Sequence, residues 1–246
     1  MATPDSALPK RSDQGPMMVP LHPHLLAHLN PVAWKGLEQL HWDASERECL
    51  AYWKAARLPL LVTGQPPDFN ERSSHIAMCI EAPIRWGRRK MRLRVAKRDV
   101  LFFDEFPVAA RIAGLLPANA RASWARLCSS FHRLGATPRV YGSYGWQGIA
   151  GGGYVHRRAE LNLWLQVTEP DEGDEIVAIL SRFQAPKMRL EAELLLIRGG
   201  AAVAAVDWRE WRARRWEAMP FRAMPAAKLP PLQRELPERE PAEALA

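Results

Sequence analysis

A strand-helix-strand pattern in the C-terminal half of the chain constrains its fold more than any other feature. Residues 160–167 and 188–197 are apolar runs of strand length, and residues 171–183 between them carry apolar side chains at helical spacing. Two strands that flank a helix in this way belong to one sheet against which the helix packs. We therefore expect a mixed sheet here, extended by a hairpin that turns at two glycines into a last strand over residues 201–206.

Shorter patterns upstream predict a second, smaller unit. Ser45 and Glu48 have the spacing of a capping box and predict a helix that runs to Arg57. Strands are expected at residues 60–63, 75–80 and 91–95. The last of these ends a basic segment, residues 85–95, whose second half alternates apolar residues with arginines, as in a strand with one charged face.

The first part of the C-terminal half predicts a long helix and a loop. Apolar residues recur at helical spacing over residues 119–134, and Asn119 is the expected cap. A short strand at residues 139–141 and a glycine-rich loop over residues 142–153 follow.

Both ends of the chain are rich in proline. Proline fixes φ and removes a backbone donor, and such segments bury too little apolar surface to offset the entropy of ordering them. We therefore expect an α+β fold in four parts. They are a disordered arm over residues 1–23, an N-terminal α+β domain over 24–106, a larger domain over 107–219 and a proline-rich disordered tail over 220–246.

Charge and composition narrow the class of partner. The 34 Lys and Arg residues outnumber the 27 Asp and Glu residues, which favours anionic partners such as polyphosphates, nucleic acids or an acidic protein surface. The three cysteines lie far apart and match neither a zinc motif nor a disulfide framework. No apolar run approaches the roughly 20 residues of a membrane span, and no signal peptide is evident. We expect a soluble, cytoplasmic protein that does not bind a membrane.

Gly142 and Ser143 follow the short strand at residues 139–141 and suit phosphate binding. Phosphoryl or nucleotidyl transfer requires amides that hold phosphate oxygens, acids that hold a divalent metal and cations that offset the leaving charge. Backbone amides at a glycine turn and a serine hydroxyl can meet the first requirement. Glycines of this spacing are also typical of plain strand-to-helix turns, so the motif alone leaves both interpretations open.

Two later strands carry oxygen ligands. Alternation places Glu160 and Asn162 on one face of the first strand, and Glu191 and Glu193 on one face of the second. An acid and a second oxygen ligand two residues apart can share Mg²⁺ with substrate phosphates, because Mg²⁺ prefers hard oxygen donors. An adjacent strand can bring Glu191 toward Glu160. A strand with one solvated face is the alternative that this alternation leaves open.

Together, these segments resemble a known family. The order of Gly142-Ser143, the acid strand and the later acid is similar to the GS, DxD and third-acid motifs of the nucleotidyltransferase superfamily. More narrowly, the chain resembles the malonate decarboxylase holo-acyl-carrier-protein synthases, also called phosphoribosyl-dephospho-CoA transferases. The resemblance covers roughly residues 45–212. The stretches that carry it are residues 137–147, 154–156 and 204–211, together with residues 87–90, which resemble a basic GKRR-like segment of the family.

This resemblance implies a fold, a reaction and a site. It implies a nucleotidyltransferase-like domain over residues 107–219. That domain would transfer phosphoribosyl-dephospho-CoA from its triphosphate precursor to a serine of the acyl-carrier subunit of malonate decarboxylase, with release of pyrophosphate. Mg²⁺ is the implied cofactor, and the carrier subunit and triphosphoribosyl-dephospho-CoA are the implied partners. The implied site comprises Gly142 and Ser143 at the triphosphate, Glu160, Asn162 and Glu191 as catalytic metal-binding residues, and Arg88, Arg89 and Lys90 at phosphates.

The acid motif departs from the family pattern. Asp-Leu-Asp is expected where this chain has Glu160, Leu161 and Asn162, and Asp is expected at Glu191. Two acids are therefore longer and one is neutral, which changes the ligand charge offered to a metal. A catalytically weakened paralogue that binds polyphosphate or carrier protein is the alternative. Nonspecific nucleic-acid binding through the basic residues is a third reading, which the salt dependence of affinity tests.

Overall fold

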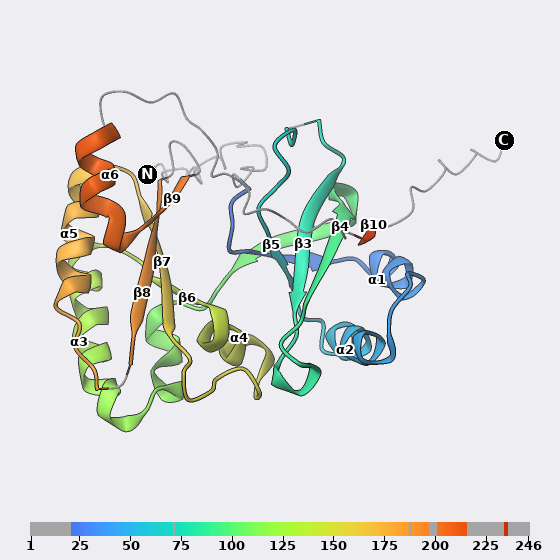
Figure 1. Ribbon diagram of the computed structural model, residues 1–246, viewed down its shortest axis with the longest axis horizontal. Helices are drawn as coiled ribbons and strands as arrows, with labels where there is room; N and C mark the ends of the chain where they lie inside the picture. Colours follow the sequence, from blue (N-terminus) through green and yellow to red (C-terminus); the bar gives the residue numbers. More distant parts are fainter. Residues whose placement is uncertain (1–20, 71, 187, 197–200, 216–233, 236–246) are drawn as a thin grey trace, which may run out of the picture.

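Alternating apolar residues build two separate sheets in the protein, which we describe from a computed structural model (Figure 1). The structure describes residues 21–70, 72–186, 188–196, 201–215 and 234–235. Within these residues, the first sheet has the strand order β10-β4-β3-β2-β1-β5 and the second has the order β6-β7-β8-β9. The predicted α+β fold class is confirmed. No helix in the described part of the chain is both long and apolar enough to span a membrane.

The first sheet is formed by β1 (Leu25–Leu29), β2 (Leu60–Val62), β3 (His75–Glu81), β4 (Lys90–Ala96), β5 (Val100–Glu105) and β10 (Arg234–Glu235). The second sheet is formed by β6 (Arg139–Tyr141), β7 (Leu161–Val167), β8 (Leu190–Leu196) and β9 (Ala201–Ala204). The α-helices are α1 (Pro31–Glu38), α2 (Ala44–Ala55), α3 (Ala118–Leu134), α4 (Gly142–Ala150), α5 (Pro170–Ser181) and α6 (Trp208–Arg215). Four short 3-10 turns are η1 (Ile84–Trp86), η2 (Lys97–Asp99), η3 (Ala109–Leu115) and η4 (Ala205–Asp207).

The predicted starts of two helices are corrected by one or two residues. In α2 the capping box is made by Asp43 and Glu46, because the Asp43 side chain accepts from Glu46 N at 2.8 Å and the Glu46 side chain accepts from Asp43 N at 3.1 Å. Ser45 lies inside the first turn instead. Helix α3 begins directly after Pro117, whose extended ψ of 143° ends the preceding segment, so Asn119 lies within the helix and does not cap it.

The predicted glycine-rich loop over residues 142–153 is wrong for most of its length. Helix α4 occupies Gly142–Ala150, and only the glycines that follow it form a loop. Gly142 takes a φ of 66°, which turns the chain from β6 directly into the helix. Tyr144 and Trp146 are buried, and their burial outweighs the poor helix propensity of the glycines.

The strand-helix-strand prediction is confirmed for the second sheet. Strand β7 pairs in parallel with β8, and α5 connects them, while β6 and β9 add antiparallel edges. Leu161, Leu163 and Leu165 are fully buried on one face of β7, where they pack in the cluster that includes residues of α3 and α5. Helices α3, α5 and α6 lie on one side of this sheet, and α4 lies toward the first sheet (Figure 1). The other face of β7 carries Asn162 and Gln166 with the buried Trp164 between them.

We expect Gly173→Ala to destabilise the protein. A Cβ at this position of α5 would overlap the ring of the buried Trp208, whose Nε1 donates to Asp174 at 2.8 Å. Overpacking of this kind costs ~1–3 kcal/mol, more than the ~1 kcal/mol that Ala gains over Gly in a helix. Chemical denaturation measures the change. The matched control is Gly114→Ala, where nothing lies within 4 Å of the added carbon; equal stability of the two variants would contradict the packing argument.

Candidate active site

Helix α4 begins against the acid strand. A Cβ at Gly142 would lie 2.7 Å from Asn162 Nδ2, so only glycine allows this close approach. Tyr141 precedes the helix, and among the described residues no side chain caps its first turn. The first amides of α4 and the positive end of its dipole therefore lie beside Asn162 without a side-chain cap among the described residues.

Strand register places the predicted ligands in one row. Asn162 on β7 pairs with Tyr141 on β6 and with Glu191 on β8. Since residues that pair across a sheet point to the same face, Asn162 and Glu191 are side by side and adjoin the start of α4. The structure thus brings together Gly142, Asn162 and Glu191 from three separate elements. That they bind metal or substrate remains a prediction.

Arg189 connects the other acid to this row. Its Nη1 lies 2.9 Å from Glu160 Oε1, and its Nη2 lies 3.5 Å from Glu191 Oε1. The two carboxylates therefore approach a single guanidinium. The arginine side chain is 76% exposed, so the two ion pairs are at the surface and are individually weak. Among the residues the structure describes, no group of three or more His, Cys, Asp or Glu side chains is placed to hold a metal ion.

The predicted basic segment lies at the opposite end of α4. Its loop connects β3 to β4, and Ile84 N donates to Gly153 O, just beyond the helix, at 2.8 Å. A helix of nine residues spans about 14 Å, which separates this loop from Gly142. Two of the three basic side chains are paired within the N-terminal unit: Arg89 contacts Asp43 at 2.6 Å and Lys90 contacts Glu81 at 2.8 Å. Arg88 is exposed and forms no ion pair within the described part of the chain.

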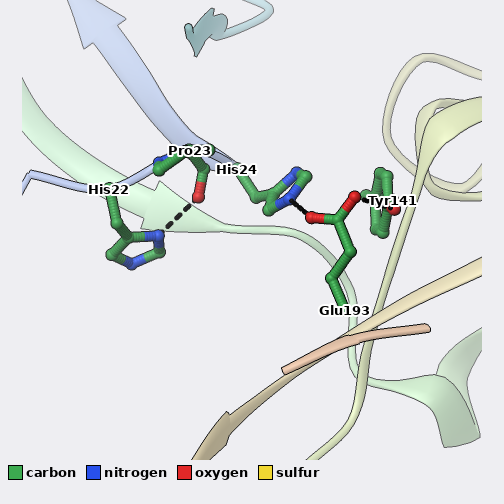
Figure 2. Close-up of polar contacts among 5 residues, drawn as sticks. All are labelled: His22, Pro23, His24, Tyr141 and Glu193. Carbon is green, nitrogen blue, oxygen red and sulfur yellow. Dashed lines mark hydrogen bonds and ion pairs between the residues drawn. The ribbon is translucent and has the colours of Figure 1, made fainter. Parts of the chain in front are cut away.

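Sequence reasoning missed a polar network next to the row of ligands. His24 Nε2 donates to Glu193 Oε2 at 2.9 Å, and the Tyr141 hydroxyl donates to Glu193 Oε1 at 3.0 Å (Figure 2). The hydrogen bond from His24 lowers the pKa of Glu193 and outweighs burial, with a further contribution from Tyr141. Burial, followed by the charge of Glu193, raises the pKa of Tyr141, which therefore stays a donor.

The sequence contains a local signal for Glu193 of this network but none for its contact with His24. Glu193 shares a strand face with Glu191, and that alternation is visible from the sequence alone. His24 follows a proline-rich segment 169 residues away from Glu193, and no local pattern connects the two. Only the tertiary fold brings the segment before β1 to the face of β8.

Two buried polar atoms adjoin the network. His22 Nε2 and Trp164 Nε1 have no hydrogen-bond partner among the described residues, and their rings lie 5.2 Å apart between centroids. His22 Nδ1 donates to Pro23 O at 2.5 Å. Burial lowers the pKa of His22, so its imidazole is neutral near pH 7 and adds no positive charge to this corner of the site.

Known proteins resemble this chain in its C-terminal half. Residues 107–221 match the family model described as the phosphoribosyl-dephospho-CoA transferase MdcG C-terminal domain, which includes α4 and all four strands of the second sheet. The resemblance seen in the sequence is confirmed: the chain is similar to this family model and to proteins named phosphoribosyl-dephospho-CoA transferase. No solved structure matches the chain.

The curated relatives extend the similarity beyond that domain. The phosphoribosyl-dephospho-CoA transferase of Bradyrhizobium diazoefficiens is 27% identical over 188 residues, which cover 76% of this chain and 80% of the relative. The protein of the same name in Xanthomonas euvesicatoria pv. vesicatoria is 29% identical, over 71% of this chain and 81% of the relative. That in Xanthomonas campestris pv. campestris is 25% identical, over 66% and 74%.

We expect His24→Ala to lower the free energy of unfolding by about 1 kcal/mol at pH 7, a value reduced for the partial exposure of Glu193. A carboxyl group whose pKa is lowered by folding stabilises the protein above its unfolded pKa, and this contribution is lost as the pH falls through the folded pKa. The difference between the wild type and His24→Ala should therefore shrink below about pH 4.3, the ordinary pKa of Glu.

Urea denaturation from pH 7 to pH 3 measures this dependence. The control is His41→Ala, since His41 is exposed and makes no side-chain hydrogen bond or ion pair with the described residues. A difference that stays constant across this pH range would show that His24 stabilises the protein by packing, without its hydrogen bond to Glu193.

Proposed function

We propose that the protein transfers the phosphoribosyl-dephospho-CoA group from its triphosphate precursor to a serine of the acyl-carrier subunit of malonate decarboxylase and releases pyrophosphate. The names of the relatives support the transferred group. The observation that carries the proposal for this chain is the row in which Gly142 adjoins Asn162 and Asn162 adjoins Glu191. A nucleotidyltransferase-type reaction needs amides and oxygen ligands side by side, and this row provides both.

The start of α4 is the proposed triphosphate site. Its amides point toward the acid row, and the helix dipole favours a negatively charged ligand there. Gly142 leaves room for a phosphate to approach the backbone, and Ser143 offers a hydroxyl in the first turn. These groups are positioned before substrate binds, so they can stabilise charge on the leaving pyrophosphate without reorganisation.

Glu160, Asn162 and Glu191 are the proposed ligands of Mg²⁺. Their oxygens are hard donors, and the two carboxylates already approach the cationic guanidinium of Arg189. Mg²⁺ in phosphate sites commonly takes one or two protein carboxylates together with waters and substrate phosphates, so two acids and an amide fit it. When bound, Mg²⁺ would offset phosphate charge and favour departure of pyrophosphate.

The basic loop between β3 and β4 is proposed to contact a phosphate farther along the substrate. It is joined to the chain just beyond the far end of α4, a helix about 14 Å long, and the proposed substrate is long enough to span such a length. Arg88 is the residue most available for this contact, because Arg89 and Lys90 already pair with acids of the N-terminal unit. Binding energy from such a remote contact helps to position the reacting phosphate.

The transfer itself is tested with the purified full-length chain. The protein is incubated with Mg²⁺, the apo-carrier subunit and triphosphoribosyl-dephospho-CoA, and the mass of the carrier and the pyrophosphate released are measured. We expect a carrier mass increased by one prosthetic group and an equal amount of pyrophosphate. A carrier of unchanged mass across metals and pH would refute the proposal.

We expect Glu160→Ala and Glu191→Ala each to lower the rate of transfer at least ~100-fold, the effect of losing one preorganised electrostatic contact. Stability should change little, because both side chains are at least partly exposed. The control is Glu175→Ala, an exposed acid on the helix behind the sheet. Full activity of Glu160→Ala, with an unchanged melting temperature, would place the site on another strand.

We expect Asn162→Asp to tighten Mn²⁺ or Mg²⁺ binding and to raise the rate of transfer, since it adds a charged oxygen ligand beside Glu191. Isothermal titration calorimetry with each metal, followed by the carrier assay, measures the two effects. Weaker metal binding in this variant would contradict the ligand role of residue 162.

The neutral Asn162 favours one second candidate, a catalytically weakened paralogue that binds polyphosphate or carrier protein. The same experiments distinguish it from the enzyme. Precursor binding by the wild type without release of pyrophosphate, together with turnover restored in Asn162→Asp, would favour the weakened paralogue.

A further inference from the structure

His24 reaches the site from outside the transferase domain. It lies just before β1, and its imidazole bonds Glu193, which is two residues beyond Glu191 on the same face of β8. Residues two apart on a strand are about 7 Å apart, so the imidazole lies one step along the sheet from the proposed metal ligands. Tyr141 connects Glu193 with the start of α4, because its hydroxyl donates to Glu193 and Gly142 follows it directly in the chain.

The hydrogen bonds of this network use one of the two nitrogens of His24. Glu193 accepts at both carboxylate oxygens, from the Tyr141 hydroxyl at Oε1 and from His24 Nε2 at Oε2. A neutral imidazole that carries its proton on Nε2 has a lone pair on Nδ1. No described residue donates a hydrogen bond to His24 Nδ1 in the structure. In this neutral form, Nδ1 is the nitrogen that can accept a proton.

The backbone of His24 is held in an uncommon conformation. Its φ is 76°, a region that side-chain-bearing residues seldom adopt and that persists where the surrounding structure enforces it. This conformation belongs to a turn over Pro23 and His24, which Leu25 N closes by donating to His22 O at 3.4 Å. The imidazole lies 4.2 Å from the Tyr141 ring and 6.2 Å from the Trp164 ring, between centroids, and it bonds Glu193.

We propose that His24 is a catalytic residue that accepts the proton of the acceptor serine during transfer, with Glu193 and Tyr141 as positioning residues. This inference rests on the proposed function. As the serine Oγ bonds to phosphorus, the bond from phosphorus to the pyrophosphate oxygen breaks, and the serine proton passes to His24 Nδ1. The resulting imidazolium is stabilised by the Glu193 carboxylate at Nε2, and its proton is later released to solvent.

The arrangement explains why the N-terminal unit belongs to the enzyme. The transferase domain supplies the phosphate and metal ligands, but among its described residues no histidine side chain contacts Glu193. The ionisable side chains that face His24 are Glu193 and Tyr141, and His22 precedes it in the chain. Of these, the carboxylate orients the imidazole and the phenol orients the carboxylate.

The test compares His24→Gly with the control His41→Gly in single-turnover transfer to the apo-carrier. Glycine accepts the φ of 76° and leaves space for added imidazole. We expect His24→Gly to lower the rate of the chemical step ~100-fold or more, with little change in carrier affinity, and added imidazole to restore part of it. His41→Gly should keep the wild-type rate and gain nothing from imidazole.

A second variant covers the case in which His24→Gly does not fold. Glu193→Gln keeps the size of the side chain, but its amide can donate to Nε2 and so move the imidazole proton to Nδ1. We expect a loss of at least ~10-fold in the same assay while His24 is still present, as in other histidine sites whose carboxylate is replaced by an amide.

The outcomes separate this inference from the proposed function. A wild type that transfers nothing refutes both. An active wild type with an unchanged rate in folded His24→Gly, or in Glu193→Gln, overturns the role of His24 and leaves the proposed function intact. A reduced rate in His24→Gly that imidazole does not restore would assign His24 to structure alone.

Discussion

The burial of Trp146 in the core of the N-terminal unit is the interaction on which the site depends. The indole packs against Trp53, Phe106 and Tyr154, and its Nε1 donates to the Glu81 carboxylate at 2.6 Å. Because Trp146 lies only four residues after Gly142 in the same helix, this burial fixes the direction of α4. The amides at the start of the helix are thereby aimed at the acid strand.

The same helix joins the two sheets into one functional unit. Tyr144 packs in the core of the second sheet and Trp146 in the core of the first, so α4 contributes to both. The hydrogen bond from Tyr52 to Ala150 O and the bond from His24 to Glu193 connect the units at two further points. A rigid connection of this kind suits a site that needs groups from both units within a few ångströms of each other.

Charge at the site is balanced by side chains that come from different strands. Asn162 offers no negative charge, and Arg189 offsets part of the charge of Glu160 and Glu191. The carboxylate of Glu193 is satisfied by two donors, so it serves hydrogen bonding more readily than exchange with a metal. The acid row and the His24 network are thus neighbours with different chemical roles in the proposal.

The sequence by itself determined the elements whose signals are local. Alternation located β3, β4, β7 and β8, and helical spacing located α3 and α5, because periodicity depends only on which face is buried. These local patterns did not predict α4, because its glycines have poor helix propensity and its stability comes from two buried aromatic side chains. Only the tertiary structure decided the row from Gly142 to Glu191 and the contact of His24 with Glu193. Strand register and contacts across 169 residues depend on packing between distant segments, which no local pattern records.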